Sequence, residues 1–366
     1  MLLYINGEMF MPPRNHKSWL SVPPVEAVSS EIYSSQEIYE QEIKNIFAKV
    51  WVPVIHKSEI RNEGDYRTSQ IAFQNILIVN AGDRVKAYRI YDSQYQVSGK
   101  LKAPIVTSEP ELYCEVKHGG MVWVTLDPNP KMNVEEWTAG AFDCIAGAID
   151  TEELEVFHYH KAIIPTNYKL WHDTNSEFYH DFMHYFNRVT GFNDEYFARK
   201  NIAFDNGHVN VSSFTVNYGE YEGAGDREAL SFPTLPPNQW YMVDLFPGFN
   251  FNLRGSAYRS DSVTPLGPNS VLIEFRGYGL LKDTPEERKQ RIDHHNTIWG
   301  PFGRNLHEDL LGVTGQGVSM APGTERRNIL HGRHENGTIH DEVGMRHYYT
   351  EWGKYLDVDP YQQTLV

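Results

Sequence analysis

Residues 167–188 read NYKLWHDTNSEFYHDFMHYFNR, and this stretch decides the fold and the chemistry that the sequence predicts. On a helical wheel at about 100° per residue, Asp173, His180 and His184 lie within roughly 60° of Glu177. The other side of the wheel carries aromatic residues, namely Phe178, Phe182, Tyr185 and Phe186. The spacing therefore predicts one helix over 167–188 that presents two carboxylates and two imidazoles in a stripe.

Two histidines one helical turn apart can bind the same divalent ion and leave coordination positions open for water, dioxygen or substrate. The alternative is that His180 and His184 lie on a polar face or hydrogen-bond to the backbone. A two-histidine site also needs a carboxylate from elsewhere, and residues 307–310 (HEDL) offer Glu308 and Asp309. Adjacent acids in a helix are commonly a solvated face, so spacing alone does not select Asp309.

The sequence before this segment indicates a terminal helix and a small β unit. Apolar spacing predicts an amphipathic helix over 31–48, and the texture then changes to short β-rich runs separated by turn residues. These runs are residues 51–55, 66–71, 76–80, 85–91, 112–116 and 121–126. The Pro128-Asn129-Pro130 sequence marks a boundary. We therefore predict an N-terminal segment and helix (1–45), a β domain (46–130) and a catalytic domain (131–366).

The second unit mixes strands and helices. Strands are predicted near 154–163, 208–218, 239–256 and 270–280, and Thr284 caps a helix with Pro285 at its first position and Glu287 in a capping box. Gly300-Pro301 ends that helix, and a further one is expected from Phe302 to about Leu311. The fold class is α+β with antiparallel sheets.

Composition excludes several classes of function. Lysine and arginine total 33 against 48 acids, a net charge of −15 that disfavours nucleic acid as a partner. No run approaches 18 uncharged apolar residues, so we expect no membrane span. Two cysteines are too few for a disulfide framework, and we expect a cytoplasmic protein.

For the other histidines in the sequence, we expect hydrogen bonding more often than metal binding. His158 and His160 point to one face of a predicted strand, where they form a candidate metal pair or make surface or core hydrogen bonds. The pairs His294-His295 and His331/His334 lie in charged sequence and are expected to be exposed.

Three stretches together carry a resemblance to a known family. They are residues 42–68 (EIKNIFAKVWVPVIHKSEIRNEGDYRT), residues 167–180 with N-Y-K-L, D-T, E and Y-H in order, and residues 308–319 with E-D, Q-G and S. They resemble the catalytic (alpha) subunits of Rieske-type non-haem iron oxygenases, over nearly the whole chain. The resemblance implies a small Rieske-like antiparallel β domain and a helix-grip (START-like) catalytic domain with a curved antiparallel sheet around a pocket.

The resemblance also implies a mononuclear Fe(II) site. Its ligands would be His180, His184 and Asp309, and Glu177 would couple the iron to electron transfer from an adjacent Rieske cluster. The family usually places four residues between its two histidines, whereas three lie between them here.

A Rieske [2Fe–2S] cluster needs two cysteines and two histidines, in a Cys-x-His pair and a Cys-x-x-His pair. The first pair of positions holds Asp92 and Gln94, and residues 93–111 contain neither cysteine nor histidine. Cys114 and His118 resemble a remnant pair whose spacing is wrong by one. The sequence therefore predicts that this chain binds no [2Fe–2S] cluster.

Three functions remain. The first is an oxygenase component that hydroxylates or demethylates a small aromatic or apolar molecule, as in aromatic hydrocarbon catabolism. A partner would supply its electrons, either a ferredoxin or a Rieske-bearing homologous subunit in a trimer-based hetero-oligomer such as an alternating heterohexamer. The second is a non-catalytic subunit of such an oligomer, and the third is a zinc hydrolase using the same three ligands.

Overall fold

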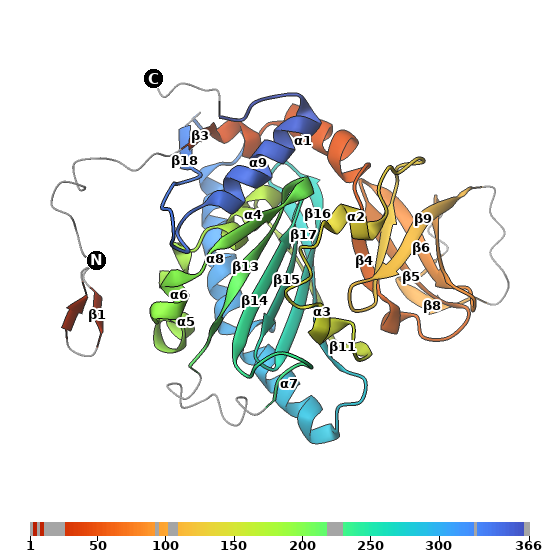
Figure 1. Cartoon of the computed structure of the whole chain (residues 1–366). Helices are drawn as coiled ribbons and strands as arrows, with labels where there is room; N and C mark the ends of the chain where they lie inside the picture. The colour runs from red at the N-terminus through yellow and green to blue at the C-terminus, as the bar shows by residue number, and fades with distance from the viewer. Residues whose placement is uncertain are drawn as a thin grey trace.

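The computed structural model describes residues 3–5, 8–10, 26–91, 95–101, 109–217, 230–325 and 328–361. Two seven-stranded antiparallel sheets form most of the molecule, and Figure 1 shows the smaller sheet standing beside the larger one. Among the described helices, none combines the length and apolar character that a membrane span requires. The antiparallel α+β class predicted from the sequence is confirmed.

The smaller sheet has the strand order β4-β10-β9-β7-β6-β5-β8. Its strands are β4 (Val52–His56), β5 (Asp65–Ile71), β6 (Gln74–Asn80), β7 (Val85–Ile90), β8 (Ser98–Lys100), β9 (Glu111–Lys117) and β10 (Met121–Thr125). Six of them match the predicted runs to within two residues, because alternating apolar positions and the intervening turns specify such strands locally. At one of these turns Gly82 has φ 88°, a conformation that glycine adopts at little cost.

The larger sheet has the order β11-β17-β16-β15-β14-β13-β12. Its strands are β11 (Leu154–Ile164), β12 (Asn201–Phe204), β13 (His208–Thr215), β14 (Gln239–Leu245), β15 (Phe249–Arg254), β16 (Ala257–Gly267) and β17 (Ser270–Leu280). The β structure predicted near 239–256 is confirmed, as a hairpin of two strands, β14 and β15. Both strands are buried on both faces at most positions, which removes the alternation that marks strand ends.

Helices line the larger sheet (Figure 1). Helix α4 (Tyr168–Ser176) packs on β14, β15 and β16, while α7 (Pro285–Ile298) packs on β16 and β17 and α9 (Val343–Leu356) on β12 and β13. Helix α8 (Arg304–Ser319) packs against α4, α7 and α5 (Tyr185–Thr190). The remaining α-helices are α1 (Gln36–Glu42), α2 (Val134–Thr138), α3 (Ala146–Ile149) and α6 (Asp194–Ala198).

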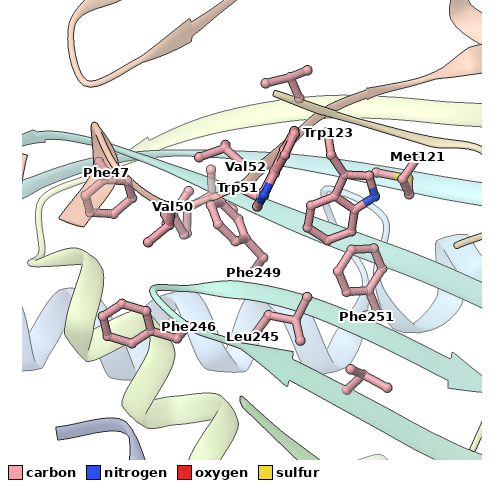
Figure 2. Close-up of a cluster of buried hydrophobic side chains, with 14 of the residues drawn as sticks. Phe47, Val50, Trp51, Val52, Met121, Trp123, Leu245, Phe246, Phe249 and Phe251 are labelled. Atoms are coloured by element: carbon pink, nitrogen blue, oxygen red, sulfur yellow. The ribbon is translucent and has the colours of Figure 1, made fainter. Parts of the chain in front are cut away.

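The two sheets share a hydrophobic core. Figure 2 shows Trp51, which directly precedes β4, and Trp123 of β10. Both side chains face Phe249 and Phe251 of β15. The Trp123 and Phe251 rings are stacked with centroids 6.3 Å apart, and both side chains are buried. One contiguous cluster of buried residues joins the two sheets, so the smaller sheet buries its apolar face against the larger. The predicted boundaries at residues 45 and 130 stay predictions.

Candidate metal centre

Buried polar contacts fix helix α4 at the start of the segment 167–188. Lys169 and Glu42 form an ion pair of 2.6 Å between two fully buried side chains, and Trp352 Nε1 donates to the same carboxylate at 2.7 Å. One turn later, the hydroxyl of Tyr349 donates to Asp173 at 3.0 Å. Asp173 is thus a structural acceptor in α4, away from the histidines with which the wheel grouped it.

The single helix predicted over 167–188 is wrong, because α4 ends at Ser176. Glu177 is extended (φ −112°, ψ 144°), a short 3-10 turn covers His180–Met183, and His184 is extended again before α5 begins. The side chain of Glu177 accepts from the backbone N–H of His180 at 3.2 Å, a local bond that competes with helix. Asn, Asp, His and aromatic residues dominate the segment, and all have modest helix propensity.

The broken backbone nevertheless brings His180 and His184 to one carboxylate of α8. Asp309 Oδ1 lies 3.0 Å from His184 Nε2 and 3.6 Å from His180 Nε2. This oxygen is buried and makes no aligned hydrogen bond within the described chain. Ligands that each lie about 2.1 Å from one ion are on the order of 3 Å apart at right angles, so the three atoms fit a common divalent ion.

Two glutamates orient the imidazoles. Glu177 Oε1 lies 2.7 Å from His180 Nδ1, and Glu308 Oε2 lies 2.8 Å from His184 Nδ1. A carboxylate that accepts the Nδ1 proton leaves the Nε2 lone pair for a metal and raises its basicity. The sequence analysis named Glu308 only as the neighbour of Asp309. Its place next to a candidate ligand was the signal that could have identified it as a residue orienting His184.

Asp181 is a second carboxylate near the histidines, and sequence reasoning missed it. Its Oδ1 lies 3.8 Å from His180 Nε2 and 3.9 Å from His184 Nε2, so these three residues form a group that can hold an ion. Asp181 already accepts from Asn187 Nδ2 at 3.1 Å and from the hydroxyl of Tyr196 at 2.8 Å. Asp309 is both closer and free of such bonds, which makes it the better third ligand.

The acids around the histidines create a site that attracts positive charge. Burial disfavours the imidazolium of His180, but Glu177, Asp181 and Asp309 outweigh it and raise its pKa to about 10. Burial likewise opposes ionisation of Asp309, yet the neighbouring histidines and Arg259 lower its pKa. A divalent cation can replace the proton that the raised pKa of His180 favours, and it can bind the ionised carboxylate that the lowered pKa of Asp309 favours.

His118, which the sequence paired with Cys114 as a remnant of the cluster ligands, is buried among aromatic side chains. The His118 ring stacks on Phe142 with centroids 4.2 Å apart, and its Nε2 lies 3.0 Å from the hydroxyl of Thr138. Asp92 and Gln94, which stand where the first pair of cluster ligands would be, lie outside the described residues.

Histidines of β11 and α7 lie close together, with their rings in contact. His158 Nε2 and His160 Nδ1 lie 2.8 Å apart, and the His295 ring is 4.5 Å from that of His158. The exposure predicted for His294, His295 and His331 is wrong, because all three are buried. In α7, His294 and His295 lie on the buried face of the helix, while Glu286 and Lys289 are exposed.

A small cavity opens beside the histidines, with a volume of about 30 Å³. Its apolar walls include Trp240, Met242 and Trp299, and its polar walls include two arginines. The full lining is Thr174, Asn175, Phe178, His180, Asp181, His184, Trp240, Met242, Asn252, Arg254, Arg259, Trp299, Asn305 and Asp309. That space holds about two water molecules, so the pocket in this conformation fits only a very small substrate.

Comparisons with known proteins agree on one family. Residues 151–358 match the family described as ring hydroxylating alpha subunit (catalytic domain). The methanesulfonate monooxygenase hydroxylase subunit alpha of Methylosulfonomonas methylovora is 53% identical, and the match covers 96% of each chain. The 2-aminobenzenesulfonate 2,3-dioxygenase subunit alpha of Alcaligenes sp is 32% identical, with 95% of this chain and 96% of that protein covered.

Solved structures share the fold at low identity. Naphthalene 1,2-dioxygenase from Rhodococcus sp. bound to indole has a TM-score of 0.72 at 15% identity, covering 93% of this chain and 95% of its own. A quaternary ammonium Rieske monooxygenase has a TM-score of 0.71 at 18% identity, covering 90% and 95%.

The alignments with both sulfonate relatives contain an internal difference. They span 400 and 387 positions, more than the 366 residues of this chain. Both relatives therefore carry residues inside the matched region that have no counterpart here.

Proposed function

The chain belongs to the ring-hydroxylating alpha-subunit family of Rieske-type oxygenases, and we propose that it hydroxylates a small organic sulfonate at a mononuclear Fe(II). Both the family resemblance and the oxygenase class predicted from the sequence are confirmed. The observation that carries the proposal is the convergence of His180 Nε2, His184 Nε2 and the unbonded Asp309 Oδ1.

The residues present fit a ferrous ion. Two imidazoles and one carboxylate are the donor set of non-haem Fe(II) oxygenases, whereas a structural zinc site would close the fourth position with a further protein ligand. When bound, the iron supplies open coordination positions at which dioxygen is activated. His180, His184 and Asp309 would hold it, with Glu177 and Glu308 keeping each imidazole in the required tautomer.

Glu177 has a second role in the proposal. It bonds to His180 and keeps 21% of its side chain exposed, so it lies between the metal site and the surface. A group on a partner can reach this carboxylate, and we assign Glu177 the coupling of electron arrival to the site. Asp181, held by Asn187 and Tyr196, would supply an acceptor for protons beside the cavity.

The substrate class rests on two relatives and on the cavity. Their names specify methanesulfonate and 2-aminobenzenesulfonate, which share a sulfonate group. A cavity of about 30 Å³ favours a molecule of one or two carbons over an aromatic hydrocarbon. We therefore replace the aromatic-hydrocarbon substrate expected from the sequence with a small sulfonate.

The electrons would come from another chain. The sequence has two cysteines, and neither precedes a histidine at the spacing that a Rieske cluster needs. A Rieske-bearing homologous subunit, in a hetero-oligomer of the ring type, or a separate ferredoxin would supply them. The same lack of ligands favours the second candidate, a non-catalytic subunit that supports an active homologue.

Metal analysis tests the ligand set. The chain, loaded anaerobically with Fe(II), should hold one iron, and His180→Ala should hold none. His334→Ala is the control, because His334 is a histidine that bonds Glu26 away from the site. Full iron retention by His180→Ala would refute the ligand assignment.

Reconstitution distinguishes the two candidates. The chain is mixed with reductase, methanesulfonate and a Rieske-bearing partner whose own iron ligands have been replaced. Oxygenated product in this mixture places the chemistry at this chain's site. Product only when the partner's iron site is intact makes this chain a supporting subunit.

A further inference from the structure

Arg259 of β16 has a buried guanidinium group, and some of its N–H donors have no acceptor among the described residues. Its side chain is 3% exposed, and its Nη2 donates to Asp261 Oδ2 at 2.7 Å. Its Nε and Nη1 atoms have no hydrogen-bond partner among the described residues. A buried donor without an acceptor costs free energy, so the folded chain leaves a place here for a further acceptor.

Aromatic packing holds the guanidinium in place. Its central carbon lies 4.9 Å from the centroid of the Trp299 ring and 5.8 Å from that of Phe275. A planar guanidinium stacked on aromatic faces loses little side-chain freedom when it binds an oxyanion. Its position is therefore set before any ligand arrives.

The guanidinium belongs to the same cavity as the proposed iron ligands. Arg259 lines this cavity together with His180, His184 and Asp309. A molecule that fills so small a space must touch both the arginine and the region of the metal. The reacting carbon of a one-carbon sulfonate is bonded directly to the anionic group, which matches this closeness.

The cavity lining carries charges of both signs. It contains two arginines, Arg254 and Arg259, and two aspartates, Asp181 and Asp309. Further carboxylates outside the lining pair with Arg259 and with the two imidazoles. The attraction for an anion is therefore local: it comes from the bound metal and from the guanidinium nitrogens of Arg259 that have no partner among the described residues.

We propose that Arg259 binds the sulfonate group of the substrate and so determines that this oxygenase takes small anions and not neutral molecules. The inference rests on the proposed function, since it assumes that substrate occupies the cavity beside His180, His184 and Asp309. A sulfonate accepts charge-assisted hydrogen bonds from guanidinium, and these are stronger than neutral ones.

Binding to the Fe(II)-loaded chain tests the inference without turnover. Calorimetric titration under anaerobic conditions compares methanesulfonate with dimethyl sulfone, a neutral molecule of similar shape. Methanesulfonate should bind at least tenfold more tightly. Arg259→Gln should lose at least tenfold in methanesulfonate affinity with little change for the sulfone, and Arg259→Lys should restore part of the loss.

Arg276→Gln is the matched control. Arg276 is equally buried, donates to a buried acid (Glu59 Oε1, 2.8 Å) and has an unpartnered Nη1, but it does not line the cavity. It should leave methanesulfonate affinity within about twofold of the unsubstituted chain. An equal loss in Arg276→Gln and Arg259→Gln would show that removing any buried arginine perturbs binding, and would overturn the assignment.

A second variant keeps the inference testable if Arg259→Gln does not fold. Asp261→Asn removes the acid that shares the guanidinium, so methanesulfonate should bind several-fold more tightly. A purely structural role for the Arg259–Asp261 pair predicts weaker binding instead. Iron content, measured in each sample, separates failure of this inference from failure of the proposed function. If the unsubstituted chain holds iron but binds methanesulfonate and dimethyl sulfone equally well, only the role of Arg259 is overturned. If the unsubstituted chain holds no iron, the proposed function is overturned.

Discussion

At the scale of single residues, the candidate centre depends on which oxygen is left without a bond. Asp181 and Asp309 both lie near His180 and His184, but protein donors already occupy the carboxylate of Asp181. The choice of third ligand therefore follows from hydrogen-bond accounting and not from proximity alone.

Substitution of the two aspartates separates their roles. Asp309→Asn should lower Fe(II) affinity at least tenfold, because it removes the anionic ligand. Asp181→Asn should retain iron, since its neighbours still hold the side chain in place. Iron per chain after anaerobic loading measures both, and a larger loss in Asp181→Asn would exchange the two assignments.

A second residue links stability to pH. His208 is buried, its Nδ1 accepts from the backbone N–H of Phe246 at 3.1 Å, and its Nε2 lies 2.8 Å from the carbonyl oxygen of Trp137. Burial lowers its pKa to about 3, far below the ordinary value near 6.5. The unfolded chain therefore binds the proton first, and stability is lost as pH falls from about 6.5 toward 3.

The expected loss from His208 between pH 7 and pH 5 is roughly 2 kcal/mol. His208→Gln has no titrating group there, so its stability should fall by that much less over the same interval. Urea unfolding at the two pH values measures the difference. If the free energy of unfolding had the same pH dependence in both proteins, His208 could not be a neutral imidazole held by two hydrogen bonds.

At the scale of elements, short sequence motifs correctly predicted the features that depend only on neighbouring residues. The capping box of α7 formed as expected: Glu287 N–H donates to Thr284 Oγ1 at 3.2 Å, and Glu287 Oε2 accepts from the N–H of Thr284 at 2.8 Å. The break at Glu177 was missed because the helical spacing of the polar residues was given more weight than their modest helix propensity and the local bond from His180 N–H to Glu177.

The same limit applies to the site. The residues His180, His184 and Asp309 came from spacing and from a family resemblance, and the structure brings them together. Arg259 stands on a strand whose two faces are both buried, so nothing in its local sequence marks it as a pocket residue. Its significance depends on the side chains that lie beside it in the fold, Trp299 after α7 and Asp309 of α8.

Removing the cap of α7 should weaken the fold by a predictable amount. Thr284→Ala should cost about 1 kcal/mol, whereas Thr284→Ser should cost little because its hydroxyl makes the same bond. Chemical denaturation compares the free energies of unfolding. Equal stability of Thr284→Ala and the unsubstituted chain would mean that packing alone determines where α7 begins.

At the scale of the whole molecule, the two sheets should unfold together. Trp123 is fully buried between them, and Trp123→Ala should cost about 3–5 kcal/mol. Far-UV circular dichroism and release of bound iron should then give one shared transition at lower denaturant. Phe302→Ala, at a side chain that is 94% exposed, should change little. Iron retention after loss of the smaller sheet would show that the two units are independent.

The shared core also bears on how such a chain can change over generations. In a protein built of separable parts, a part that no longer carries its prosthetic group can be deleted. Here the smaller sheet supplies Trp51 and Trp123 to the packing that supports β15, the strand that ends at Arg254 of the pocket. On the prediction that the sheet binds no cluster, its task is this packing, because deletion of the sheet would expose the apolar face of β15 to water. We therefore expect the smaller sheet to be retained for its structural packing and not for electron transfer.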